Sequence, residues 1–283
     1  MTRLIIVEGL PGSGKSTISK MIYDILTESG REAVLFQEGN LDHPADHEGV
    51  AMLTTDLYKK LLRDPVNAVW LDSGFIMEDE KHVLVPYRKL QEKYGADLPE
   101  GLLTVLAGSD VYEQPFEINR DLIISKWKQF AAQAQEEETI YVFECCFIQN
   151  PVTVGMVKYG LNKEAVADYI LGLAEAASCL DPLLIYIEQD DYSSSFKRAV
   201  DERPREWAEE FTAYYTHQGY GKRMNLAGLE GAEAVLKARG EMELEILRSL
   251  PIDKVMLNNS RYDQKLARSR LIEMISPFCQ GIK

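Results

Sequence analysis

Five short stretches with apolar centres predict strands, and the most continuous of them, residues 3–8, is the kind of run expected in a parallel sheet covered on both faces. They occupy residues 3–8, 32–38, 139–151, 182–188 and 253–259. Helices are predicted where apolar residues recur every three or four positions. These cover residues 15–30, 116–138, 162–177, 193–217 and about 228–249. We expect Asn162 to cap the helix at 162–177, and a last helix to follow the capping box at 260–263, Ser-Arg-Tyr-Asp.

The alternation of strands and helices predicts an α/β fold, a doubly wound three-layer sandwich around a five-stranded parallel sheet. No low-complexity linker or repeat divides the chain, so we expect a single domain over residues 1–283. The stretch from about 43 to 115 is less regular, and we expect it to be an insertion on the substrate side.

Within that stretch, residues 67–79 and 82–90 flank a charged turn and predict either a hairpin or two helical pieces. Aromatic residues also gather in this region. They could stack on a ring-bearing substrate or, alternatively, belong to the core. The residues concerned are Trp70, Phe75, Tyr87, Tyr94, Tyr112 and Phe116.

The formal charge of −14 over 283 residues argues against a nucleic-acid partner and against binding to an anionic membrane. No apolar run approaches the roughly 18 residues that span a bilayer, and the N-terminal MTRLIIVEGL is too short a run for a signal peptide. The cysteines form no CxxC pair, so we expect reduced thiols and a cytoplasmic protein. They are Cys145, Cys146, Cys179 and Cys279. A small anionic ligand is still compatible with this charge, because a local pocket can be positive.

Residues 7–17, VEGLPGSGKST, contain the full pattern G-x-x-x-x-G-K-[ST] between a predicted strand and a predicted helix. The glycines let backbone N–H groups point inward at phosphate oxygens, and the helix N-terminus adds its dipole. Lys15 is expected to bind the β- and γ-phosphates, and the Ser16 hydroxyl to bind Mg²⁺. The sequence therefore predicts a site for ATP with Mg²⁺ as cofactor. The predicted nucleotide-binding residues of this loop are Gly9, Pro11, Gly12, Ser13, Gly14, Lys15, Ser16 and Thr17.

Glu144 ends the apolar part of the third strand and is the expected second magnesium ligand beside Ser16. A carboxylate in so apolar a strand is costly to bury unless it binds a cation or hydrogen-bond donors. The alternative is that Glu144 lies at the polar rim of the sheet.

Arginines gather after the fourth strand, although the chain as a whole is acidic. Arg198, Arg203 and Arg205 lie close together, and Pro204 divides the segment into two helical pieces. We expect residues from about 190 to 206 to form a hinged lid whose cations close over the triphosphate. The alternative is a solvated helix with Arg198–Glu202 and Asp201–Arg205 pairs.

These motifs resemble those of the nucleoside and nucleotide kinase superfamily, the thymidylate and deoxynucleoside kinases. The resemblance is carried by VEGLPGSGKST with Glu8 before the first glycine, by PLLIYI followed by FKRAVDERPRE, and by VMLNNS. It covers about half of the chain. It implies the P-loop strand order 2-3-1-4-5 and a loop after the last strand that approaches adenine, with Asn259 binding the nucleotide. Cys145 and Cys146 stand where that family has arginine and serine.

Family analogy places a catalytic carboxylate at the end of the second strand, where this chain has Glu38. Such a group could take the proton of an acceptor hydroxyl during attack on the γ-phosphoryl. Asp42 and His43 are alternatives for this role, and a solvated acidic loop is the simpler interpretation of the segment. We predict that catalysis depends on Lys15, Glu38, Arg198, Arg203 and Arg205.

The sequence thus predicts a kinase that passes the γ-phosphoryl of Mg-ATP to a hydroxyl or phosphate of a small-molecule acceptor. The alternative is a P-loop ATPase or nucleotide switch that acts on a protein partner. A sulfotransferase-like P-loop protein is disfavoured, because the Lys-Ser pair suits a magnesium-bound triphosphate. The acceptor stays open between a nucleoside, a nucleotide, a sugar and an antibiotic-like compound, and a homodimer is an open alternative for the assembly.

Overall fold

The computed structural model describes all residues except 1, 72–76, 79–81 and 279–283. Phe75 and Cys279 therefore lie outside the described residues. The chain forms two compact units. The first consists of residues 1–38 and 127–283, and the second consists of residues 39–126 and contains the whole of the predicted insertion.

The first unit is built on a five-stranded sheet whose paired strands all run parallel. Its spatial order is β2-β6-β1-β7-β8, which is 2-3-1-4-5 when only these five strands are counted along the chain. The predicted α/β fold is therefore confirmed. The strands are β1 (Leu4–Gly9), β2 (Ala33–Phe36), β6 (Ile140–Glu144), β7 (Leu183–Glu188) and β8 (Asp253–Asn258).

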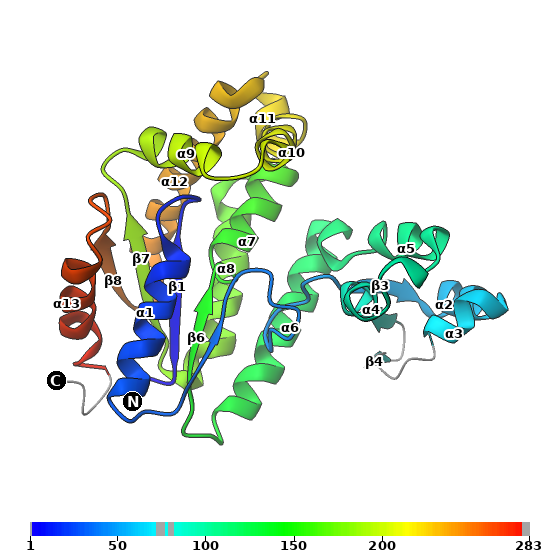
Figure 1. Cartoon of the computed structure of the whole chain (residues 1–283), viewed down its shortest axis with the longest axis horizontal. Helices are drawn as coiled ribbons and strands as arrows, with labels where there is room; N and C mark the ends of the chain where they lie inside the picture. The colour runs from blue at the N-terminus through cyan, green and yellow to red at the C-terminus, as the bar shows by residue number, and fades with distance from the viewer. Residues whose placement is uncertain (1, 72–76, 79–81, 279–283) are drawn as a thin grey trace. The chain divides into compact units, whose positions relative to one another are not determined.

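Helices cover both faces of this sheet, as Figure 1 shows. On one face, α1 (Lys15–Glu28) and α13 (Gln264–Ile275) bury Ile22 and Leu271 against Val7 and Ile185. On the other face, Trp127 of α6 (Phe116–Ala134) packs edge-on against Phe143 of β6. The remaining helices of this unit are α7 (Gln149–Val152), α8 (Lys163–Ala177), α9 (Tyr192–Asp201), α10 (Arg205–Thr216), α11 (Gly219–Arg223) and α12 (Gly228–Ser249).

Three local predictions can be compared with the structure. Asn162 caps α8, because its side chain accepts a hydrogen bond from the Ala165 N–H at 3.1 Å, as predicted. The third strand was predicted to run to residue 151 but ends at Glu144, since Cys145 adopts a positive φ of 70°. The capping box predicted at 260–263 was wrong. Asp263 itself caps α13, and its carboxylate accepts from two N–H groups of the first turn.

The second unit has its own antiparallel sheet, of order β3-β5-β4, and its own apolar core. Residues 67–71 are helical and β4 pairs with β5, so this part contains both a helix and a hairpin-like pair. Tyr87 is buried and Trp70 contacts Tyr94 edge-on at 4.9 Å, as the core interpretation predicted. The elements are β3 (Ala51–Thr54), α2 (Thr55–Leu62), α3 (Pro65–Leu71), β4 (Met77–Glu78), β5 (His82–Val85), α4 (Tyr87–Tyr94) and α5 (Glu100–Ala107).

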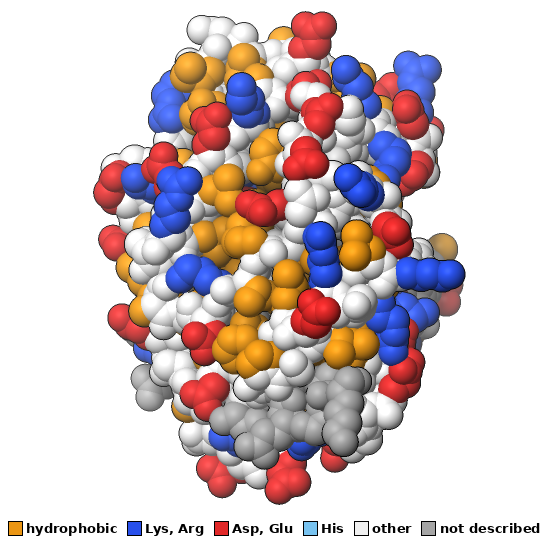
Figure 2. Space-filling model, turned by 90° about the vertical axis from the view of Figure 1, so that its left-hand side faces the viewer, with side chains coloured by type: hydrophobic (Ala, Val, Ile, Leu, Met, Phe, Trp, Pro, Cys, Tyr) orange, Lys and Arg blue, Asp and Glu red, His pale blue; other side chains and the backbone are white. Residues whose placement is uncertain are grey.

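The surface and the helices add two observations on the class of protein. Figure 2 shows one face on which Lys and Arg side chains are interspersed with Asp and Glu, and hydrophobic side chains lie between them. This face therefore presents no continuous basic surface. Among the described residues, no helix combines the length and the hydropathy that a membrane span requires.

Candidate active site

The loop between β1 and α1 requires glycine at two positions. Gly12 and Gly14 have φ angles of 85° and 94°. A Cβ atom at Gly12 would lie 2.5 Å from the Ser195 carbonyl oxygen, and one at Gly14 would lie 2.7 Å from Nδ2 of Asn259. Both the backbone angle and the close neighbours therefore exclude a side chain at these positions.

Two carbonyl groups of this loop are bound by side chains from other parts of the unit. The Gly12 carbonyl accepts from the Tyr262 hydroxyl at 2.9 Å and from Arg198 Nη2 at 3.1 Å. The Ser13 carbonyl accepts from Asn259 Nδ2 at 2.8 Å and from Gln189 Nε2 at 3.1 Å. The first N–H groups of α1 lack intrahelical partners, so N–H groups are available to bind an anion. Asn259, predicted to bind nucleotide, thus contacts the loop directly.

Lys15 lies at the start of α1 with only 6% of its surface exposed. Its ammonium group donates to the Leu10 carbonyl at 3.3 Å, which folds the side chain back over the loop. Burial acts against the charged form, but the neighbouring ionisable groups Cys145, Glu38 and Glu144 act in the opposite direction, and the pKa of Lys15 is raised. The side chain is therefore a cation placed inside the loop.

Ser16 and Glu144, the two predicted magnesium ligands, lie side by side. The Ser16 hydroxyl donates to Glu144 Oε1 at 2.6 Å, and the Ser19 hydroxyl donates to Oε2 at 3.1 Å. A carboxylate oxygen of Glu38 and the Cys145 thiol lie within 4.8 Å of the Glu144 carboxylate. Hydroxyl and carboxylate oxygens are the donors that Mg²⁺ prefers, whereas a thiol is not. The oxygen donors of this cluster therefore fit magnesium.

Glu8, noted in the sequence only for its place before Gly9, proves to be fully buried. Its Oε1 accepts the N–H groups of Phe147 and Ile148 at 2.8 and 2.9 Å, and its Oε2 accepts that of Gln149 at 3.1 Å. Burial raises the pKa of Glu8 to about 7, and the backbone N–H groups act in the opposite direction. Glu8 therefore fixes the segment that follows β6. A carboxylate at the end of an otherwise apolar strand was the available signal for this role.

Gln149 connects this segment to the end of β2. Its Nε2 donates to Glu38 Oε1 at 2.7 Å, while the Cys145 thiol lies 3.4 Å from Glu38 Oε2. The predicted catalytic carboxylate of Glu38 thus lies beside the Ser16–Glu144 pair and is held by Gln149, which no sequence motif marks.

The three arginines of the predicted lid have different surroundings. Arg198 bonds Gly12, and its guanidinium lies 3.3 Å from the centre of the Tyr262 ring. Arg203 and Arg205 are exposed: Arg203 lies over the Trp207 ring, and Arg205 pairs with a glutamate of its own helix. Of these three arginines, all within the described part of the chain, Arg198 is the one that donates a hydrogen bond to the P-loop. Residues 202–204 separate α9 from α10, as the break predicted at Pro204 requires.

The two predicted arginine–carboxylate pairs have different outcomes. Arg198 pairs with Glu202 at 3.6 Å, as the alternative of a solvated helix predicted. The predicted Asp201–Arg205 pair was wrong, because Arg205 Nε bonds Glu209 at 2.8 Å instead.

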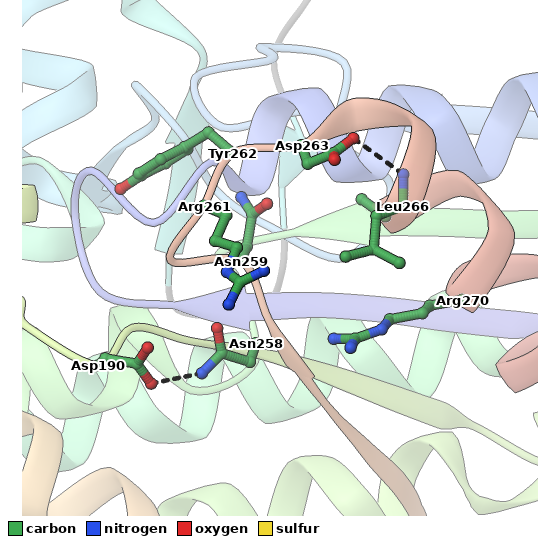
Figure 3. Close-up of a pocket in the computed structure, with 9 residues that line it drawn as sticks. Asp190, Asn258, Asn259, Arg261, Tyr262, Asp263, Leu266 and Arg270 are labelled. Carbon is green, nitrogen blue, oxygen red and sulfur yellow. Dashed lines mark hydrogen bonds between the residues drawn. The ribbon is translucent and has the colours of Figure 1, made fainter.

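A pocket of about 370 Å³ lies beside the loop that follows β8. Figure 3 shows Asn259 and Tyr262, which hold the P-loop carbonyls, at one part of its lining, and Arg270 of α13 at another. Asn258 Nδ2 donates to Asp190 at 2.6 Å, which ties the end of β8 to the segment after β7. The pocket thus adjoins the segment after β8, whose Asn259 and Tyr262 side chains donate hydrogen bonds to the Ser13 and Gly12 carbonyls.

The alternative bases belong to the second unit. Asp42 pairs with Lys89 at 2.5 Å, and His43 is buried with its pKa lowered to about 3 by that burial. His47 is buried in the same unit, and burial lowers its pKa to about 4. Neither histidine belongs to the cluster of metal-binding side-chain types found among the described residues.

Helix α12 contains a buried ion pair, which no motif in the sequence predicts. Arg239 Nε donates to Glu243 Oε1 at 2.6 Å, and each side chain is 1% exposed. Arg239 Nη1 also donates to the hydroxyls of Tyr215 and Thr153, and the Tyr186 hydroxyl donates to Glu243. The pair therefore joins α12 to α10, to β7 and to the π-helical turn Thr153–Lys158.

A parallel sheet of this order, with an anion-binding loop and a lysine at the start of the first helix, defines the class of a P-loop nucleotide-binding protein. Residues 1–64 match the model of a family described as chromatin associated protein KTI12. The match includes β1, the P-loop, α1 and β2, and it covers less than a quarter of the chain. It points to a P-loop NTPase and not to a thymidylate or deoxynucleoside kinase. No match was found among curated protein sequences.

Proposed function

We propose that this protein is a kinase that transfers the γ-phosphoryl group of ATP to a small-molecule acceptor. The observation that carries this proposal is the place of Glu38, whose carboxylate lies within 4.8 Å of the Glu144 carboxylate and is held by Gln149. Glu38 could receive the proton of an acceptor.

The remaining roles follow from the contacts of the P-loop. Its N–H groups and Lys15 would hold the triphosphate, and Ser16 with Glu144 would hold Mg²⁺, which when bound neutralises phosphate charge and orients the β- and γ-phosphates. Arg198 would stabilise the loop from the lid. The last strand resembles that of nucleoside and nucleotide kinases, in which the following loop approaches adenine. The adenine of ATP would therefore enter the pocket beside Asn259 and Tyr262.

Arg203 and Arg205 keep the role predicted for the lid only if the lid moves, because both are exposed and neither bonds the P-loop among the described residues. Lids of this kind close over bound phosphates. The expectations of a cytoplasmic location, of a small-molecule partner and of a homodimer as one form of assembly are parts of the same proposal.

The second candidate is an NTPase that acts on a macromolecular partner. The match of residues 1–64 to the chromatin associated protein KTI12 family favours it. The formal charge of −14 makes a protein a better partner than a nucleic acid.

The test is a screen of small hydroxylated compounds for ADP release from Mg-ATP, with Lys15→Ala as the control for contaminating activity. Release that depends on one compound and disappears in the variant supports the kinase. An ATP hydrolysis rate that no compound changes would favour the second candidate.

A further inference from the structure

Carboxylates stand at the carboxyl ends of three neighbouring strands. Glu8 lies in β1, Glu144 ends β6, and Glu38 lies two residues beyond the end of β2. Glu8 accepts the Gln149 N–H, and the Gln149 side chain in turn donates to Glu38. A continuous set of hydrogen bonds therefore runs from the buried end of β1 to the exposed carboxylate after β2.

This set of bonds makes the two oxygens of Glu38 different. Oε1 accepts a hydrogen bond of 2.7 Å from the Gln149 amide, whereas Oε2 lies 3.4 Å from the Cys145 thiol. A thiol is a weak donor, so Oε2 retains most of its capacity to accept a proton. Gln149 is 8% exposed, and its backbone is held by Glu8, so the amide keeps a fixed position.

The charges around Glu38 suit one class of acceptor better than the other. A phosphate monoester is already an anion at neutral pH, since its second pKa is about 6, and it needs no base to become a nucleophile. The carboxylates of Glu38 and Glu144 would also repel it. An alcohol is uncharged and gains from a positioned base, a gain of typically 10²–10⁴-fold.

The lid arginines of the first unit do not compensate this negative charge at Glu38. In the described residues, Arg198 bonds the Gly12 carbonyl and stacks on Tyr262, and Arg203 lies over Trp207. Lys15 is the cation that the proposed function already assigns to the triphosphate.

We propose that the acceptor of this enzyme is an uncharged hydroxyl and not a phosphate, and that Gln149 is the residue that positions Glu38 as its base. The inference rests on the proposed kinase function. In the transfer step, the acceptor oxygen forms a bond to Pγ as the bond from Pγ to the bridging β–γ oxygen breaks. The hydroxyl proton moves to Glu38 Oε2, and ADP leaves with the bridging oxygen.

The first experiment offers matched pairs of compounds, each an alcohol and its phosphate monoester, such as thymidine and thymidine 5′-monophosphate. Products formed from Mg-ATP are followed by ³¹P NMR, which separates a new phosphomonoester from a new diphosphate. The expected result is phosphomonoester formed at least 100-fold faster than diphosphate. Diphosphate as the main product would overturn the inference while leaving the kinase function intact. ATP hydrolysis without transfer to any compound would refute both.

The second experiment is a double-variant cycle on the best alcohol, with Glu38→Gln, Gln149→Leu and the combination. Glu38→Gln should lower kcat by 10²-fold or more, and Gln149→Leu by about 10-fold, with little change in KM for ATP. In the Glu38→Gln background, Gln149→Leu should have no further effect, because it acts through Glu38. Equal effects in both backgrounds would show a merely structural role and contradict the positioning of Glu38.

Gln218→Leu is the matched control, because this glutamine also makes a side-chain hydrogen bond, to the Tyr214 carbonyl, and lies just before α11, outside the segments that contain Glu38 and Gln149. It should leave kcat unchanged. Thermal melting of each variant checks that all proteins compared are folded.

Discussion

Replacement of Arg239 by methionine is expected to lower the free energy of unfolding by about 3–5 kcal/mol. This is the usual cost of breaking a buried ion pair by removing one partner, because the other charge is left in a medium of low polarity. The conditions for that cost are met here. Arg239 and Glu243 are each 1% exposed and 2.6 Å apart. Without the guanidinium, the Glu243 carboxylate would keep the hydrogen bond from Tyr186, which does not neutralise its charge.

The magnitude can be separated from simple loss of packing by a second substitution. Glu243→Met alone should also cost about 3–5 kcal/mol, since it leaves the arginine buried and unpaired. The combination of both substitutions removes both charges and should cost under about 2 kcal/mol, the remainder being due to the hydroxyls that lose a partner. The sum of the single effects would be about 6–10 kcal/mol, so a coupling of about 4 kcal/mol or more is expected.

The assay is equilibrium unfolding in urea at pH 7, followed by circular dichroism, for the three variants and the parent protein. Arg248→Met is the control, because Arg248 is an exposed arginine of the same helix, and it should change stability by less than about 0.5 kcal/mol. Additive single effects, or a cost below about 1 kcal/mol for Arg239→Met, would refute the view that this pair holds α10, α12 and β7 together.

Three further predictions concern the nucleotide site and the second unit. Lys15→Ala should abolish ATP turnover without unfolding the protein, measured by ADP release and circular dichroism; residual turnover above about 1% would contradict the role of the P-loop. Arg203→Ala should lower turnover more than nucleotide affinity, while Arg198→Ala should also weaken nucleotide affinity, because it removes the hydrogen bond to the Gly12 carbonyl. Calorimetry measures the affinity and single-turnover kinetics measure the transfer rate. The same changes in affinity and rate for both variants would contradict different roles for the two arginines. His43→Asn should reduce the loss of stability on acidification, because the pKa of His43 is lowered to about 3 in the folded state, so that the unfolded state takes up the proton first as the pH falls below about 6.5. Between pH 7 and pH 5 the parent protein should lose about 2 kcal/mol more than this variant in urea unfolding, and parallel losses would show that His43 is not buried as a neutral group.

Much of the first unit could be predicted from the sequence because its strands and its glycine loop have strong local signals. The central strands of the sheet, β1 and β7 above all, are apolar runs, and the spacing from Gly9 to Ser16 allows few conformations other than a phosphate loop. The meeting of Ser16 and Glu144 was also predictable, because both lie at the carboxyl edge of one parallel sheet.

The contacts that position the site were less accessible, since they join residues far apart in sequence through ordinary side chains. No motif marks Gln149 or Tyr262 as a residue of the site, and their roles depend on where Glu38 and the Gly12 carbonyl lie in space. Glu8 was visible as a carboxylate in an apolar strand, but its partners are the backbone N–H groups of residues 147–149, which carry no residue signature. The end of β6 was misjudged because Cys145, an apolar residue, makes the turn at a positive φ.

The two sides of the P-loop carry side chains of different kinds, hydrogen-bond donors on one side and carboxylates on the other. Donor side chains, Arg198, Tyr262 and Asn259, act on the carbonyls of Gly12 and Ser13, on the side where the pocket after β8 opens. Carboxylates gather around Ser16 at the ends of β2 and β6. A polyanion is stabilised by the first set and repelled by the second, unless a divalent cation intervenes at Ser16 and Glu144. Under the proposed function, a divalent cation held by Ser16 and Glu144 would let a triphosphate lie with its terminal phosphate toward Glu38 despite the net charge of −14. Replacing the negative charge at this place by a positive one, with Glu38→Lys, should increase the affinity for phosphate compounds and abolish phosphoryl transfer to an alcohol.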